Sequence, residues 1–196
     1  MYFFERLNIK KLRKILFVII AVCIAFFGVC QGYVYVLKKY VYPLSYKKQV
    51  LESSKEFFLD SALVYAVIKT ESSFNQDAVS EKGAMGLMQI TRPTADFIAL
   101  RLGIGDYDLF QPSVNVRFGC YYLRYLIDRF QNLKTALCAY NAGEGNVRAW
   151  LKNVQYSLDG KSLYKIPFKE TQEYIVKIEK SFTKYTKLYG KIVDNE

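Results

Sequence analysis

One glutamate of this sequence stands where the pattern calls for an apolar side chain. Asp60 can cap a helix whose apolar residues share one face: Leu63, Val64, Val67 and Ile68. Glu71 comes one helical turn after Val67 and Ile68, so it continues this face. Burial against apolar neighbours disfavours the charged form and can raise the pKa of a glutamate to about 6. Glu71 could then give and take a proton near neutral pH, although an ordinary helix-end residue can have the same spacing.

The sequence contains no histidine, and this restricts the chemistry that the chain can perform. Nucleophilic catalysis by Ser-His-Asp or Cys-His groups is excluded, and the commonest zinc ligand is missing. Acid–base chemistry must therefore rest on Asp, Glu, Lys, Tyr or Cys, with carboxylates as the leading candidates. We expect neither a metal nor an organic cofactor.

The four cysteines fall into two pairs along the sequence. Cys23 and Cys30 lie in an apolar run and have neither metal-ligand nor redox spacing. Cys120 and Cys138 each lie in an apolar helical context, which favours two small buried side chains. A disulfide between them is the alternative outside the cytoplasm, and the sequence leaves it open.

The first forty residues differ from the rest. From Ile15 to Leu37 no residue is charged, and a helix rising about 1.5 Å per residue over this length crosses a hydrocarbon core of about 30 Å. No small-residue cleavage site follows, so we predict an uncleaved anchor over residues 15–37 rather than a signal peptide. A short basic cytoplasmic tail over 1–14 precedes it, and a basic stalk over 38–56 follows. Basic residues flank both ends, so charge alone does not set the orientation.

Residues 57–190 are sufficient for one ordinary domain, followed by a tail over 191–196. Besides the helix after Asp60, start and stop signals predict helices after Pro93, after Pro112, over 133–140 and over 170–190. The stretch between Ser73 and Ile90 has no helical period and contains glycines, so turns with a short strand or hairpin are expected there. The predicted fold class is mainly α, with a small β or irregular insertion.

The formal net charge of +10 comes from basic residues spread over termini and helix faces. Such a field suits an anionic envelope polymer or a lipid surface. No nucleic-acid-binding module accompanies the charge, so we do not expect nucleic acid as a partner.

Four segments of the chain carry further signals, at residues 71–75 (ESSFN), 83–90 (GAMGLMQI), 139–143 (AYNAG) and 166–175 (IPFKETQEYI). In this order and spacing they closely resemble the motifs of soluble-lytic-transglycosylase (SLT) type domains of the lysozyme-like superfamily. The resemblance spans about residues 57–190. It implies a lysozyme-like α+β fold and an enzyme that acts on the glycan strands of peptidoglycan.

The resemblance also implies a mechanism with Glu71 as the sole catalytic acid and base. Glu71 would protonate the glycosidic oxygen between N-acetylmuramic acid and N-acetylglucosamine. Its carboxylate would then take the proton of the muramoyl C6 hydroxyl, which closes a 1,6-anhydro ring. Most glycosidases instead use two carboxylates.

Substrate-contacting roles follow from the resemblance at matching positions: Ser80, Met88, Gln89, Tyr140, Asn141, Glu170 and Tyr174. The Ser80 hydroxyl could bind an N-acetyl group or orient Glu71, and Tyr140 could hydrogen-bond the Glu71 carboxyl or the substrate. Met88 could pack beside Glu71 or fill the core. Gln89 would line the cleft, and Tyr174 lies one helical turn beyond Glu170.

Two residues depart from the family pattern, because Gln76 and Glu144 stand where prolines are common. Neither change removes a catalytic group. Glu144 would place an extra carboxylate near the cleft, which could alter subsite preference or raise the pKa of Glu71 by like-charge repulsion.

These inferences together predict a single-pass membrane enzyme whose catalytic domain faces the cell wall, because peptidoglycan lies outside the cytoplasmic membrane. Partners in an envelope complex stay unidentified. One alternative is a hydrolytic muramidase, which would need a second carboxylate such as Asp77, Glu81 or Asp96. Another is a non-catalytic wall-binding scaffold. The sequence also leaves open whether strands are cut at their ends or internally.

Overall fold

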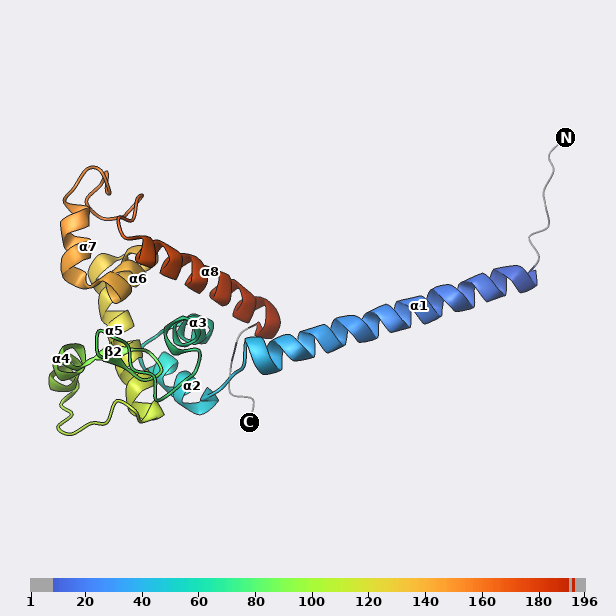
Figure 1. Ribbon diagram of the computed structural model, residues 1–196, viewed down its shortest axis with the longest axis horizontal. Helices are drawn as coiled ribbons and strands as arrows, with labels where there is room; N and C mark the ends of the chain where they lie inside the picture. Colours follow the sequence, from blue (N-terminus) through green and yellow to red (C-terminus); the bar gives the residue numbers. More distant parts are fainter. Residues whose placement is uncertain (1–8, 191, 193–196) are drawn as a thin grey trace. The chain divides into compact units, whose positions relative to one another are not determined.

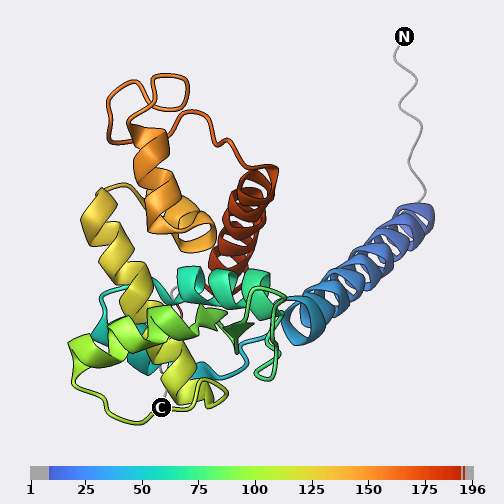
Figure 2. The same cartoon turned by 60° about the vertical axis from the view of Figure 1, so that its left-hand side comes forward.

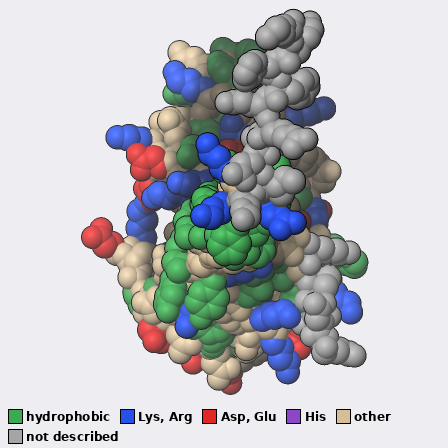
Figure 3. Space-filling model, turned by 90° about the vertical axis from the view of Figure 1, so that its right-hand side faces the viewer, with side chains coloured by type: hydrophobic (Ala, Val, Ile, Leu, Met, Phe, Trp, Pro, Cys, Tyr) green, Lys and Arg blue, Asp and Glu red, His purple; other side chains and the backbone are tan. Residues whose placement is uncertain are grey.

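The computed structural model describes residues 9–190 and residue 192, and it divides into two compact units with the boundary after Pro43. The first unit contains α1, Ile9–Val36, and the short π-helix η1, Leu37–Val41. Figure 3 shows hydrophobic side chains gathered on α1, with Lys and Arg side chains around them. In the described part of the chain, one helical stretch, Lys11–Val41, is long and apolar enough to cross a membrane. The first eight residues of the predicted tail over 1–14 lie outside the described residues, as does the tail over 191–196 apart from Ile192.

The second unit, which begins at Leu44, is mostly helical (Figure 1). Its helices are α2 (Lys47–Glu56), α3 (Ser61–Ser72), α4 (Arg92–Leu102), α5 (Pro112–Phe130), α6 (Leu133–Ala142), α7 (Glu144–Leu151) and α8 (Lys169–Tyr189). Two short antiparallel strands, β1 (Ala84–Met85) and β2 (Ile90–Thr91), form a hairpin between α3 and α4, with Met85 opposite Ile90. The predicted fold class, mainly α with a small β insertion, is confirmed.

Helix α3 lies in the centre of this unit. Seven consecutive residues, Ala62–Ile68, are buried, as expected for a helix that is apolar on every side and surrounded by protein. Asp60 caps the helix as predicted, because its Oδ1 accepts a hydrogen bond from the Ala62 N–H at 2.8 Å. Helices α8 and α2 pack against α3. The first residue of α3, Ser61, and its last turn, Lys69–Ser72, are partly exposed, and this last turn carries Glu71.

The long helix α5 supports the other side of the unit. It packs against α2, α4 and α6, while α6 in turn contacts α7 and α8. Pro112 begins α5 because its fixed φ suits the first helical turn, and Gln131 ends it in the left-handed conformation with φ of 51°. Figure 2 shows the hairpin strands beside the start of α4.

Asn115 of α5 fixes the loop that carries the hairpin. This side chain is 1% exposed, and its Oδ1 accepts a hydrogen bond from the Met88 N–H at 2.7 Å. Its Nδ2 donates to the Met85 and Leu109 carbonyl oxygens at 2.9 and 2.8 Å. Gly86 must pass close beside it, with φ of +75°, because a Cβ there would lie 2.2 Å from the Asn115 Nδ2. The loop therefore depends on one buried amide that satisfies three backbone groups.

The structure differs from the predicted basic stalk over residues 38–56. Residues 47–56 form α2, which packs against α3 and α5 and buries Val50 and Leu51. Ser53 and Ser54 are buried as well. The helix was missed because two of its four buried positions are serines, so the apolar periodicity is weak.

The four cysteines are free thiols in the structure. Cys120 and Cys138 are buried, as the apolar helical contexts predict. Burial raises the pKa of the Cys138 thiol to about 12 and that of Cys120 still further. Neither thiol is therefore a reactive thiolate near neutral pH.

We predict that Gly119→Ala destabilises the domain by about 1–3 kcal/mol, as overpacking does. An added Cβ would lie 2.3 Å from the Sδ and 2.6 Å from the Cβ of Met88, which is fully buried. The free energy of unfolding, measured on the full chain in detergent, checks this. Gly145→Ala is the matched control, because a Cβ at this helical glycine meets nothing within 4 Å. Equal stabilities of the two variants would contradict the packing described.

Candidate active site

Glu71 lies in the last turn of α3, just before the chain turns at Ser73 with φ of 50°. The pKa of its carboxyl is raised from 4.5 to about 7. Desolvation by burial is the largest cause, and the negative charge of Glu170 adds to it, while a hydrogen bond from Tyr174 acts in the opposite direction. The Glu71 carboxyl therefore keeps its proton to a higher pH than an ordinary glutamate does.

Tyr174 of α8 is the hydrogen-bond partner of Glu71. Its Oη donates to the Glu71 Oε1 at 2.6 Å, and the side chain is 6% exposed. Burial, followed by the charge of Glu71, holds the pKa of Tyr174 well above its usual value. The phenol thus keeps its proton and orients the carboxyl, a partnership that the resemblance did not predict.

Tyr140 does not contact Glu71 directly, although either this contact or one with the substrate was expected. Its Oη donates to the Met88 carbonyl oxygen at 2.8 Å. Burial, then the charge of Glu71, raises the pKa of Tyr140 well above its usual value. Tyr174, and not Tyr140, therefore donates the hydrogen bond to the Glu71 carboxyl, and a contact of Tyr140 with the substrate stays a prediction.

Ser80 and Gln89 hold the hairpin loop through backbone hydrogen bonds. The Ser80 Oγ accepts from the Ala84 N–H at 3.0 Å. The Gln89 Nε2 donates to the carbonyl oxygens of Ala78 and Gly86 at 3.1 and 3.0 Å, and Gln89 itself has φ of 50°. Both side chains also line the hollow beside Glu71, so each can serve the loop and a ligand.

Met88 lies in the core and not at a substrate surface. It is 0% exposed and packs against Gly119 of α5. Of its two predicted environments, the structure supports core filling. Its prediction as a substrate contact is therefore wrong for this conformation, because the hairpin turns this apolar side chain inward.

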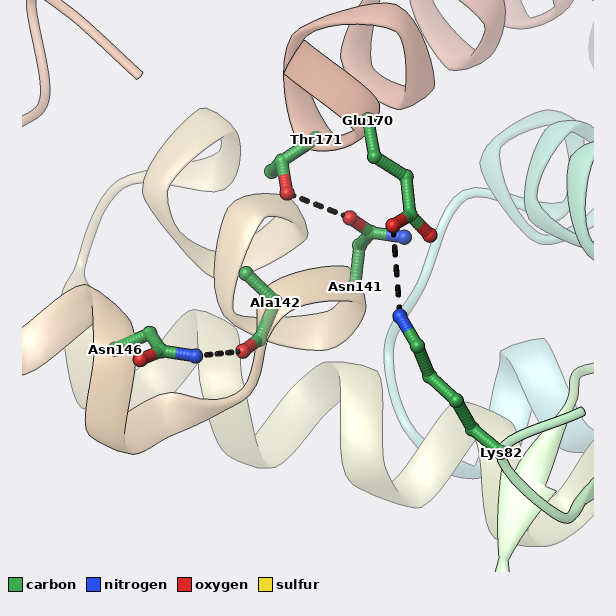
Figure 4. A network of polar contacts seen from close by, with 6 residues as sticks. All are labelled: Lys82, Asn141, Ala142, Asn146, Glu170 and Thr171. Carbon is green, nitrogen blue, oxygen red and sulfur yellow. Dashed lines mark hydrogen bonds and ion pairs between the residues drawn. The ribbon is translucent and has the colours of Figure 1, made fainter. Parts of the chain in front are cut away.

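Asn141, Glu170 and Thr171 meet where the end of α6 faces the start of α8 (Figure 4). The Thr171 Oγ1 donates to the Asn141 Oδ1 at 2.7 Å, which leaves the Asn141 amide N–H groups for a ligand. The Lys82 Nζ lies 3.4 Å from the Glu170 Oε2. The sequence analysis missed Thr171 and Lys82. The spacing of Thr171 and Tyr174, three apart on one helix face, was the available signal.

Two hollows adjoin along these residues. The first, of about 450 Å³, is the Glu71 hollow, lined by Glu71, Ser80, Glu81, Lys82, Ala84, Gln89, Thr91, Tyr140, Asn141 and Glu170. The second, of about 330 Å³, is the Asn146 hollow, and its lining adds residues such as Thr94, Tyr122, Asn146 and Phe168. Six of the eight predicted site residues therefore line the Glu71 hollow. The other two, Met88 and Tyr174, are buried and line neither hollow.

Glu144 is held away from Glu71 by cations. Arg129 and Arg148 both pair with its Oε1, and the Tyr125 Oη donates to its Oε2 at 3.4 Å. Glu170, and not Glu144, is the carboxylate that raises the pKa of Glu71. The expected effect of Glu144 on the pKa of Glu71 is therefore wrong, and two guanidinium groups lie beside the Glu144 charge and offset it. Its effect on subsite preference stays a prediction.

The three carboxylates named for a hydrolytic alternative lie in different places. Glu81 lines the Glu71 hollow. Asp77 is exposed, and its N–H bonds the Asn75 side chain. Asp96 pairs with Arg92 and accepts a hydrogen bond from Tyr107. Neither aspartate lines a hollow with Glu71.

Comparison with known families agrees with this geometry. The model of the transglycosylase SLT domain matches residues 49–162. The chain belongs to this family. The match includes Glu71, the hairpin loop and the end of α6, and it stops before Glu170 and Tyr174 of α8. The resemblance to the family is thereby confirmed: the motifs at 71–75, 83–90 and 139–143 lie within the match, while the one at 166–175 follows it.

Individual relatives are lytic murein transglycosylases. The soluble lytic murein transglycosylase of Salmonella typhimurium is 34% identical over 139 residues, which cover 68% of this chain and 22% of that protein. The membrane-bound lytic murein transglycosylase C of Glaesserella parasuis is 32% identical over 167 residues, covering 71% and 45%. The SLT-family chain thus spans less than half of either relative.

Solved structures show the same fold. An inactive mutant of the lytic transglycosylase Slt from Pseudomonas aeruginosa has a TM-score of 0.66 and 31% identity, over 79% of this chain and 26% of that one. The 70 kDa soluble lytic transglycosylase of Escherichia coli has a TM-score of 0.67 and 27% identity over the same shares.

The raised pKa of Glu71 predicts a pH-dependent stability gain in Glu71→Gln. Below pH 4.5 the carboxyl is protonated in both the folded and the unfolded state, so it costs nothing. Between pH 4.5 and 7 the unfolded chain releases the proton first, and the parent loses up to about 3 kcal/mol. Above pH 7 the loss is complete. Urea unfolding of both chains should show a difference that grows across this window, and a constant difference would contradict it.

The hydrogen bond from Tyr174 predicts that Tyr174→Phe raises the pKa of Glu71 above its parent value, since a donor to the carboxylate favours the anion. Titration of the Glu71 carboxyl carbon by NMR measures this. Tyr140→Phe is the matched control, because its hydroxyl donates to a backbone carbonyl oxygen, and we expect a smaller shift. A larger shift in Tyr140→Phe would reverse the assignment.

Proposed function

We propose that this chain is a peptidoglycan lytic transglycosylase that cleaves the bond between N-acetylmuramic acid and N-acetylglucosamine and leaves 1,6-anhydro ends. The observation that carries the proposal is the position of Glu71, whose carboxyl accepts a hydrogen bond from the buried Tyr174 at 2.6 Å and lines a hollow with Ser80 and Asn141. Burial, which raises the pKa of this carboxyl to about 7, agrees with a role as proton donor. Membership of the SLT family supports the same activity.

The proposed reaction uses Glu71 twice. The protonated carboxyl gives its proton to the glycosidic oxygen, the bond to the muramoyl C1 breaks, and N-acetylglucosamine leaves with a free hydroxyl. The Glu71 carboxylate then takes the proton of the C6 hydroxyl, whose oxygen bonds to C1 and closes the anhydro ring. Glu71 ends protonated, ready for another turnover.

Tyr174 fits this cycle as a positioning residue. Its short hydrogen bond stabilises the carboxylate formed after the first proton transfer, while burial stabilises the protonated form. The two effects oppose each other and keep the pKa near neutral. Such a carboxyl can act in both directions without a large free-energy difference between its two states.

The other residues of the Glu71 hollow are proposed to hold the glycan. Ser80, Gln89, Tyr140, Asn141 and Glu170 line it with hydroxyl, amide and carboxylate groups, which suit sugar hydroxyls and N-acetyl groups. In the proposed steps the substrate's own hydroxyl takes the place of water. A second carboxylate, as in most glycosidases, is therefore not used.

We further propose that α1 anchors the chain in the cytoplasmic membrane as a single span, with the second unit on the outer side. The length and apolar surface of α1 support an anchor, and some relatives are named membrane-bound. The proposed substrate supports the orientation, because peptidoglycan lies outside that membrane. In this arrangement the catalytic domain begins with α2, since this helix is part of its core.

Mass spectrometry of digested glycan strands tests the proposed reaction, because anhydro ends weigh one water less than hydrolysed ends. We expect the full chain to release anhydro ends, and Glu71→Gln to lower the rate by about 10²–10⁴. Glu179→Gln, a change at an exposed glutamate of α8 that lines neither hollow, is the matched control and should retain the rate.

Three results would contradict the proposal. Hydrolysed reducing ends as the main product would make the chain a muramidase, with Glu81 as the next residue to test. Strand cleavage that persists in Glu71→Gln would remove Glu71 from the reaction. A chain that binds strands and cuts none would be a wall-binding scaffold.

A further inference from the structure

The ion pair between Lys82 and Glu170 spans the border between the two hollows. Both residues line both hollows, together with Gln89, Thr91, Tyr140 and Asn141. Lys82 comes from the turn before β1 and Glu170 from the first turn of α8, and Figure 4 shows the two side chains reaching toward each other. A glycan strand that occupies both hollows must therefore pass this pair.

The pair is too exposed to hold the fold together. The side chains are 81% and 71% exposed, and the Nζ lies 3.4 Å from the Oε2. Exposed ion pairs of this kind contribute little to stability, because water competes for both charges. A ligand that offers Lys82 another anion can therefore take it from Glu170 at little cost.

Lys82 is also the only positively charged side chain among the described residues that line either hollow. The other charged groups there are the carboxyls of Glu71, Glu81 and Glu170. These carboxylates would repel a substrate anion. A carboxylate that enters either hollow can therefore pair with only one of the lining side chains, the Lys82 ammonium. Uncharged sugar hydroxyls can be bound by the neutral hydroxyl and amide groups of the lining, so they do not require an ammonium group.

We propose that Lys82 is a receptor for a carboxylate of the substrate's peptide stem and that Glu170 holds it in place while the groove is empty. This inference rests on the proposed function, since peptide stems occur on muramoyl residues. Binding exchanges one ion pair for another: the Lys82 ammonium leaves Glu170 and donates to the stem carboxylate, with no covalent step. Lys82 would thereby favour strands with charged stems over uncharged glycan.

Binding to the full-length Glu71→Gln chain tests this, because it needs no turnover. The two probes are uncross-linked peptidoglycan strands and the same strands with stem carboxylates converted to methylamides. We expect the charged strands to bind about tenfold more tightly, because the charge-assisted hydrogen bond to the stem carboxylate is stronger than the exposed Lys82–Glu170 pair that it replaces. Adding Lys82→Gln should abolish this preference, and Lys82→Arg should keep it. Lys184→Gln, which removes an exposed charge outside both hollows, should also keep it.

A second variant distinguishes two roles of Lys82: direct binding of the stem carboxylate, and neutralisation of the Glu170 charge. Lys82→Gln alone also leaves Glu170 unneutralised, and its charge would repel the stem. The double change Lys82→Gln with Glu170→Gln removes both charges. A receptor predicts that the preference stays lost in this variant, whereas its return would overturn the proposal. Equal weakening of both probes by Lys82→Gln would overturn it as well.

This test is independent of the reaction products. If the active chain yields hydrolysed rather than anhydro ends, the proposed function fails and the binding preference still decides the role of Lys82. If anhydro ends form and the two probes bind alike, the role of Lys82 fails and the proposed function stands. High salt should reduce the preference and leave the methylamide probe unaffected.

Discussion

The burial of one carboxyl group between α3 and α8 is the constraint on which the site depends. Helix α3 is surrounded by apolar neighbours until its last turn, so Glu71 sits where its charged form is poorly solvated. Tyr174 opposes this cost with one short hydrogen bond, and its own burial keeps its proton in place. The result is a carboxyl with a near-neutral pKa at the edge of a hollow of about 450 Å³.

Several residues in the loops around that hollow have an unfavourable backbone conformation, which hydrogen bonds from neighbouring elements offset. Ser73, Phe74 and Gln89 adopt positive φ, a conformation that costs a non-glycine residue about 1–2 kcal/mol. Compensating bonds come from Asn115, which fixes the hairpin loop from α5, and from the Ser72 Oγ, which donates to the Leu87 carbonyl oxygen at 2.8 Å. Met88 anchors the same loop in the core. The hairpin is thus a wall held by buried polar groups more than by its two-residue strands.

The sequence predicted those elements of the fold whose start, end and buried face depend on neighbouring residues in the chain. Apolar spacing with Pro and Gly signals predicted α5 and α8, and Asp60 capped α3 as expected. Helix α2 was missed because buried serines hide its inner face. The Tyr174–Glu71 bond joins residues 103 positions apart, and no local rule links them. For Glu144 one partner, Arg148, lies four residues on along the same helix and could have been found from the sequence, whereas Arg129 comes from the end of another helix.

The protonation state of Glu71 in the resting chain tests the central claim most directly. Infrared difference spectra between the parent and Glu71→Gln, recorded across pH, separate the protonated carboxyl from the carboxylate of this one residue. The account predicts a protonated band that disappears with a midpoint near pH 7. A midpoint near 4.5, the usual value for glutamate, would contradict it, because the carboxyl would then be ionised before any glycosidic oxygen arrived.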